Sequence, residues 1–338
     1  MTISSEVSSH VDDVLRAQAR DYLSRVLAEM AAPQIAHTPV DLPAGGDLAL
    51  TIFDVLTSRR FCDLGRRKAQ AYQEEVVQSL RARIQANGAF RFFLDVGPGY
   101  HASTRPGIVP LSSDVGLSEL LLLFQVDAFC REIHGLYAPG AHFFFVVDNV
   151  CALKTNDVPL EQTQGYVRQF RELIATMAMT DRVELVVESE IVDLEEYDRE
   201  LAALPVQAPA DDIAPAAVDN VARFLGRSCT PTEAAERVER YRRTSDVTNR
   251  LLDRFVQGVH MTQRATGATL GFRSFPGGDQ RAQVGELALT PAVKGSVRPV
   301  LLTTRNIDGY DCERLDLSDI LPPPVASITV ARPRTPEL

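Results

Sequence analysis

FRFFLD (residues 90–95) and HFFFVVD (residues 142–148) are the two stretches of sequence that decide the fold of this chain. Each is a short apolar run that ends at an acidic residue, and VELVVES (residues 183–189) follows the same pattern. Such runs are typical of strands buried on both faces of a parallel sheet. Apolar residues recur at helical spacing between them, from Ser118 to His134 and again after Pro159. The alternation predicts an α/β fold with a Rossmann-like, mostly parallel sheet flanked by helices.

The residues before this region are predicted to be helical. Apolar side chains recur at helical spacing from Val11 to Met30, and a second helical stretch runs from about Arg66 to Gln85. We therefore expect residues 1–86 to form a helical N-terminal lid or layer. Residues 87–338 are expected to form a Rossmann-like α/β catalytic domain, and the two parts one compact unit.

The last third of the chain is predicted to contain a loop, then a helix, and then several strands. The Pro- and Ala-rich segment from Leu204 to Val218 predicts a surface loop, and Thr230, Pro231 and Glu233 are typical of a helix start. Strand-like runs follow, separated by Gly and Pro, and we expect them to form a C-terminal, antiparallel extension of the main sheet. These runs are residues 268–275, 297–303 and 326–330.

The composition is that of a globular protein, with 338 residues, 45% hydrophobic and 24% charged, and a formal net charge of −10. No basic block interrupts the acidic balance, so we expect no nucleic-acid partner and no membrane partner. No spanning segment or secretory signal is visible, and five scattered cysteines favour reduced thiols. These features predict a cytoplasmic protein that acts on a small molecule. The oligomeric state stays open, with a homodimer among the alternatives.

Polar residues and glycines follow each predicted strand. Ligands bind at the carboxyl ends of the strands in an open parallel sheet, which selects Asp95-Val96-Gly97-Pro98-Gly99-Tyr100, Asp148-Asn149 and Glu188-Ser189-Glu190. The first segment resembles the D-x-G-x-G loop of enzymes that use S-adenosylmethionine (SAM), in which Gly97 and Gly99 let the backbone approach the ligand closely. A plain strand-to-loop turn is the alternative, because short glycine motifs are common.

The residues around this loop have expected roles in SAM binding. Asp95, together with Asp114 nineteen residues further on, is expected to anchor the nucleoside. His101 lies within the glycine loop, so among the histidines it is the one expected to contact the ligand. Tyr100 or Tyr137 is expected to face the sulfonium through cation–π attraction.

The sequence lacks the residue spacings that several other kinds of functional site require. The six histidines are dispersed without an H-E-x-x-H pattern, so no metal site is expected. There is no G-x-S-x-G hydrolase elbow and no G-x-x-x-x-G-K-[ST] phosphate loop. The missing third glycine argues against a dinucleotide-binding loop of the NAD or FAD type.

One region of the chain resembles the pyoverdine/dityrosine biosynthesis family, which includes the isocyanide synthases. The family pattern is roughly Y-x-P-G-A, an apolar strand ending in S-D-G, and a helix with Tyr near its start. The resemblance implies a Rossmann-like fold and an enzyme of specialised metabolism that acts on an amino acid. The matching segments are residues 136–141, 142–150, 156–159 and 166–174, with Ser113, Asp114 and Glu119 upstream.

The chain departs from the family at two places. The family loop F-P-x-K-S, whose lysine is expected to engage a sugar phosphate, is replaced by VGPGYHAS (residues 96–103), and the D-G of the strand end becomes Asp148-Asn149. A divergent member that lacks this lysine is expected to bind SAM, as the azetidine-2-carboxylate synthases of nonribosomal-peptide pathways do.

In that reaction the amino nitrogen of SAM attacks the γ-carbon and expels methylthioadenosine. Asp148 and Asn149 would hold or deprotonate the amino-acid end, with Tyr100 as the third catalytic residue. Three alternatives stay open: an isocyanide-synthase-like enzyme, a SAM-dependent methyltransferase, and a binding or scaffold subunit without activity.

Overall fold

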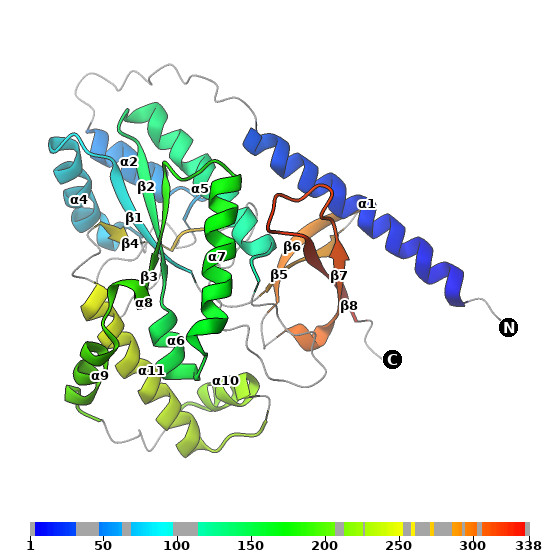
Figure 1. Cartoon of the computed structure of the whole chain (residues 1–338). Coiled ribbons are helices and arrows are strands. Elements are labelled where there is room, and N and C mark those ends of the chain that lie inside the picture. Colours follow the sequence, from blue (N-terminus) through cyan, green and yellow to red (C-terminus); the bar gives the residue numbers. More distant parts are fainter. Residues whose placement is uncertain are drawn as a thin grey trace.

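Two four-stranded sheets and the helices packed on them make up the described part of the chain (Figure 1). The computed structural model describes residues 4–31, 47–62, 69–96, 114–206, 213–225, 227–252, 258–260, 271–273, 286–292, 295–302 and 306–334.

The main sheet has the strand order β3-β2-β1-β4, and each neighbouring pair is parallel. Its strands are β1 (Phe90–Val96), β2 (Ala141–Val147), β3 (Val183–Val187) and β4 (Val259–His260). The three strands predicted from apolar runs are confirmed, and the order matches the first four strands of a Rossmann sheet. The chain passes from β3 to the far side of β1 before it forms β4, so the connections change direction next to β1.

Side chains alternate between the two faces of this sheet. Phe92, Phe143 and Leu185 belong to the larger core cluster, whereas Phe93 and Val146 belong to a separate cluster on the other face. The acids at the ends of the three predicted strands fall on the same side of this alternation as Phe93 and Val146. Sequence alternation therefore directs them to the same face.

Helices cover both faces (Figure 1). The larger core packs under α5 (Leu117–Leu136) and α7 (Leu160–Thr176), and the smaller core under α6 (Asn149–Asn156), α9 (Leu194–Ala203) and α11 (Pro231–Leu252). The connecting helices are α8 (Glu188–Ile191) and α10 (Pro215–Leu225). The helix start at Thr230 is confirmed, because the Thr230 hydroxyl accepts a hydrogen bond from the Glu233 amide at 3.2 Å. Part of the expected loop from Leu204 to Val218 is helical instead, because α10 begins at Pro215.

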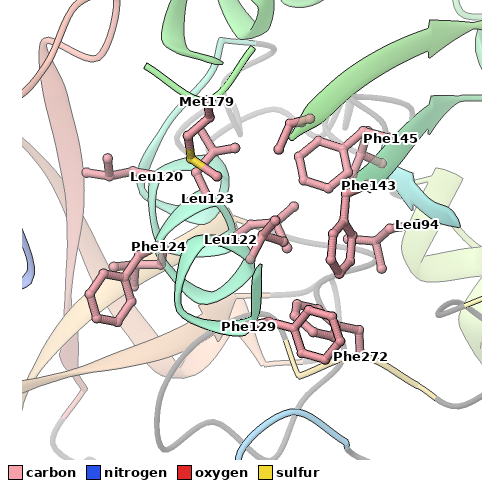
Figure 2. Packing of buried hydrophobic residues seen from close by; sticks show 14 of the residues in the cluster. Leu94, Leu120, Leu122, Leu123, Phe124, Phe129, Phe143, Phe145, Met179 and Phe272 are labelled. Atoms are coloured by element: carbon pink, nitrogen blue, oxygen red, sulfur yellow. The ribbon is translucent and has the colours of Figure 1, made fainter. Parts of the chain in front are cut away.

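Aromatic rings fill the interface between the main sheet and α5 (Figure 2). The Phe129 ring of α5 stands edge-on against Phe92 and Phe143, with ring centroids 5.2 and 5.5 Å apart. Phe272 adds a further ring, 5.4 Å from Phe143. Edge-to-face aromatic pairs of this kind stabilise a core beyond their buried area.

The N-terminal helices lie against the outer elements. They are α1 (Ser4–Ala31), α2 (Leu48–Leu56), the short 3-10 helix η1 (Gln70–Tyr72) and α4 (Gln73–Gln85). The two predicted helices are present, and the expected start of the second, at about Arg66, lies outside the described residues. Helix α1 packs on α5 and β6, and α2 packs on α4 and α5. They form a layer, and a lid over a ligand stays a prediction.

Two of the three predicted C-terminal runs, residues 297–303 and 326–330, are confirmed as strands, while the run 268–275 lies mostly outside the described residues. Four C-terminal strands form a sheet of their own, with the order β6-β5-β8-β7. They are β5 (Glu286–Ala292), β6 (Ser296–Leu302), β7 (Tyr310–Asp316) and β8 (Ser327–Pro333), with the 3-10 helix η2 (Ile307–Gly309) before β7. The expectation that they extend the main sheet is wrong. Leu287 and Leu289 of β5 pack in the same core as α5, so this sheet covers the helix.

Gly258 lets β4 approach β1 at the point where the connections change direction. A Cβ atom on Gly258 would lie 2.5 Å from the Arg91 carbonyl oxygen and 2.7 Å from the Phe93 ring. We expect Gly258→Ala to destabilise the fold by about 1–3 kcal/mol, because backbone and a buried ring must move. Gly309→Ala is the matched control, since nothing lies within 4 Å of its added methyl group. Equal urea midpoints for both variants would contradict this packing.

Candidate functional site

Three carboxyl groups meet at the carboxyl end of the main sheet. Asp95 lies near the end of β1, Asp148 follows β2, and Glu188 follows β3. Val147 and Val187 are paired in the register of β2 and β3, which sets Asp148 beside Glu188, while Asp95 pairs with Val146. The group lies where α6, α8 and α11 approach the strand ends (Figure 1). The three carboxyl groups also lie next to β1, where the strand connections change direction. Ligands bind at this point in open α/β sheets.

Glu188 is fully buried and tied to two helices. Its Oε2 accepts hydrogen bonds from the backbone amides of Val150 (3.0 Å) and Cys151 (2.9 Å), in the first turn of α6. Its Oε1 accepts one from the Thr248 hydroxyl of α11, at 2.7 Å. A carboxylate at a helix N-terminus is favoured by the helix dipole as well as by these bonds. Even so, burial raises its pKa to about 7, with the three bonds opposing the shift.

Asp148 is the more strongly perturbed acid. Removal from water is the main cause, and the charges of Asp95 and Glu188 add to it, so that the pKa of Asp148 rises to about 8. The Asp148 carboxyl makes no capping bond to α6 although the residue is the N-cap. In the described residues it forms no ion pair with a lysine or arginine. A carboxyl group that titrates near neutral pH is suited to proton transfer.

Asn149 joins the ends of β2 and β3. Its amide nitrogen donates to the hydroxyls of Ser189 (2.8 Å) and Thr163 (3.2 Å), and its oxygen accepts from the Ser189 amide at 3.0 Å. The residue is 1% exposed. These bonds give Asn149 a positioning role, and direct contact with a ligand stays a prediction.

Further acidic groups line the starts of α5 and α7. Glu119 accepts hydrogen bonds from the Gly116 amide at 2.8 Å and from the Tyr166 hydroxyl at 3.2 Å. Burial and the Glu119 charge raise the pKa of Tyr166 well above its usual value, and the Asp148 charge also contributes. Asp114 accepts a bond from the Gln169 amide at 3.1 Å and is exposed. The edge therefore carries acids from four segments, namely the ends of β1, β2 and β3 and the start of α5.

A pocket of about 410 Å³ lies beside Asn149 and Ser189. Val167 and Val187 contribute apolar lining, and Arg168 stands on its rim. Its volume is within the range of small-molecule sites.

The structure brings together some of the residues predicted from the sequence and separates others. Asp95, Asp148 and Asn149 lie at one edge, whereas Tyr137 lies at the opposite edge, where its ring packs on Phe90 at 4.7 Å and its hydroxyl donates to the Gly88 carbonyl. Tyr137 thus has a packing role in the structure. The predictions for Gly97, Gly99, Tyr100 and His101 fall outside the described residues.

Glu188 was selected with the other residues at the strand ends but was given no role, and Tyr166 and Thr248 were not predicted as site residues. Glu188 stands at a strand end, which was the available signal, and Tyr166 lies within a segment that carries the family resemblance. Thr248 had no signal, because its place depends on the packing of α11. In the described residues, no group of three or more His, Cys, Asp or Glu side chains has an arrangement that could hold a metal ion.

Comparison with solved structures places this geometry within a known fold class, a Rossmann-like sheet with a second C-terminal sheet. The chain is similar to the PvcA protein of Pseudomonas aeruginosa, with a TM-score of 0.63 and 19% identity over 85% of this chain and 100% of that chain. Tyrosyl-tRNA synthetases are more distant: that of Archaeoglobus fulgidus has a TM-score of 0.32 and 11% identity, covering 62% of this chain and 61% of its own. No protein-family model and no curated protein sequence matches the chain. Within the described ranges, no helix is long and apolar enough to cross a membrane.

The raised pKa of Asp148 predicts a pH-dependent stability difference. Its folded-state pKa of about 8 lies above the usual 3.8, so the native state holds a proton that the unfolded state loses. Stability from this group therefore falls as the pH rises from about 4 to about 8. We expect the melting temperature of Asp148→Asn, relative to wild type, to increase across that window. Val206→Ala, which changes an exposed side chain that does not titrate, should give a constant difference. A constant difference for Asp148→Asn as well would contradict the shifted pKa.

Proposed function

We propose that the protein is a SAM-utilising enzyme of specialised metabolism that cyclises SAM to azetidine-2-carboxylate and releases methylthioadenosine. The observation that carries this proposal is the meeting of Asp95, Asp148 and Glu188 at one strand edge, with Asp148 titrating near neutral pH. Three neighbouring acids favour a cationic ligand, because a bound cation lowers the electrostatic cost of ionising them side by side. SAM carries two such groups, a sulfonium and an ammonium.

The chemistry assigns a proton acceptor to Asp148. Its carboxylate takes one proton from the ammonium of SAM, and the resulting amine attacks the γ-carbon of the same molecule. The N–Cγ bond forms as the Cγ–S bond breaks, so the sulfonium leaves as the neutral thioether of methylthioadenosine. The product keeps a protonated ring nitrogen and its carboxylate, and Asp148 passes its proton to water.

The sulfonium supplies the leaving group, so the protein has mainly to hold SAM in a folded, reactive conformation. Asp95 and Asp114 are proposed to hold the nucleoside, with Gly97 and Gly99 of the D-x-G-x-G loop close to it. His101 and Tyr100 of the same loop would complete the grip. Asn149 keeps the ends of β2 and β3 together around the amino-acid end.

A second candidate is isocyanide formation from an amino acid. The family resemblance of residues 136–174 favours an isocyanide-synthase-like enzyme, and the similarity in fold to PvcA is consistent with it. Against it stands the sequence of residues 96–103, which lacks the lysine expected to engage a sugar phosphate.

Titration calorimetry separates the two candidates. The SAM hypothesis expects binding of both SAM and methylthioadenosine to the purified protein, and heat from neither would rule it out. Incubation with amino acids and ribulose 5-phosphate should give no isonitrile. An isonitrile product would establish the second candidate instead.

A further inference from the structure

Glu188 is held in place more completely than either neighbouring acid. Both of its oxygens are occupied, Oε2 by the amides of Val150 and Cys151 and Oε1 by the Thr248 hydroxyl. The two amides belong to the turn that immediately follows Asp148. Glu188 therefore restrains the backbone on which Asp148 stands, from the next strand of the sheet.

The same contacts fix a negative charge next to Asp148. The register of β2 and β3 sets the two carboxyl groups side by side, and Glu188 adds its charge to those acting on Asp148. Because its own three donors stabilise the charged form, Glu188 ionises at lower pH than Asp148. The Glu188 carboxyl therefore carries more of its charge than the Asp148 carboxyl does at a given pH.

We propose that Glu188 is a positioning residue: through its bonds to the Val150 and Cys151 amides it holds the turn bearing Asp148, and it places a second carboxyl group beside that of Asp148. This inference rests on the proposed function for the identity of the proton donor. It assigns to Glu188 no contact with the ligand.

The other titratable groups packed around the pair do not supply this charge. Burial raises the pKa of Cys151 in α6 to about 12, and burial likewise raises the pKa of Tyr166 in α7 and of Tyr197 in α9. These groups are neutral near pH 7. Among the described residues, Asp95 of β1 also acts on Asp148, and its charge raises the pKa of Asp148 more than the charge of Glu188 does. Helix α11 contributes the uncharged Thr248.

The test is a titration of Asp148 in Glu188→Gln. Glutamine keeps an oxygen for the two α6 amides and an amide nitrogen that can donate to Thr248, so the variant removes the charge and little else. Protein labelled with ¹³C at the aspartate carboxyls is titrated by NMR, with the Asp148 signal identified by its loss in Asp148→Asn. We expect the midpoint of Asp148 to fall by about one pH unit.

The matched control is Glu184→Gln, which removes the same charge from the other end of β3, where the side chain is 60% exposed. Its Asp148 midpoint should equal that of wild type. If Glu188→Gln does not fold, Thr248→Val replaces it: loss of the hydroxyl makes Glu188 harder to ionise, and the Asp148 midpoint should fall in the same direction. An unchanged midpoint in the folded variant overturns the inference.

This readout is independent of turnover. If wild-type protein neither binds nor converts SAM while Glu188→Gln still lowers the Asp148 midpoint, the proposed function fails and the role of Glu188 stands. If wild type is active, the acid limb of its kcat–pH profile should move to lower pH in Glu188→Gln and stay in place in Glu184→Gln. An acid limb that does not move in Glu188→Gln overturns the role of Glu188 and leaves the proposed function intact.

Discussion

Asp148→Asn is expected to lower kcat for SAM cyclisation by about 100- to 10,000-fold. The change removes the proton acceptor but keeps the shape of the side chain, and asparagine is a favourable N-cap for α6. The amine would then have to lose its proton to water. The rate of methylthioadenosine release, followed by liquid chromatography at saturating SAM, measures the effect.

Asp157→Asn makes the same substitution at the other end of α6. Asp157 has a left-handed backbone (φ 57°), which asparagine tolerates, and is exposed. Its kcat should match that of wild type. An Asp148→Asn rate within about threefold of wild type would show that Asp148 is not the proton acceptor.

Phe143→Ala is expected to destabilise the fold by about 3–5 kcal/mol. Phe143 is completely buried in the aromatic cluster, where its ring contacts those of Phe129 of α5 and Phe272 (Figure 2). Its removal leaves a cavity that rings from three other segments cannot fill. Urea unfolding followed by circular dichroism gives the loss as a lower midpoint.

Val206→Ala is the control for this loss, because Val206 is 71% exposed. Its cost should stay within about 0.5 kcal/mol. If Phe143→Ala unfolds at the same urea concentration as Val206→Ala, the cluster is not the centre of the core.

The parts of the fold that could be predicted from sequence are those with a local signal. FRFFLD, HFFFVVD and VELVVES are short, mostly apolar runs, and an acid at or near the end of each marks the carboxyl end of the strand. Helix α6 was not predicted, because its eight residues directly follow a strand and carry no amphipathic pattern. The position of the C-terminal sheet depends on packing of Leu287 and Leu289 in the core with α5, which has no local signature.

The same distinction applies to the site. Asp95 and Asp148 could be predicted together because parallel strands end at the same edge. Tyr137 lies at the opposite edge because α5 runs back along the sheet and ends beside Phe90. Thr248 reaches Glu188 only because the chain crosses from β3 to α11. Sixty residues separate the two in sequence, and no spacing rule connects them.

The most direct test of SAM cyclisation is mass spectrometry of the products that purified protein forms from SAM alone. We expect azetidine-2-carboxylate and methylthioadenosine in equal amounts, with no acceptor added. Methylthioadenosine without azetidine-2-carboxylate, S-adenosylhomocysteine, or unchanged SAM would contradict it.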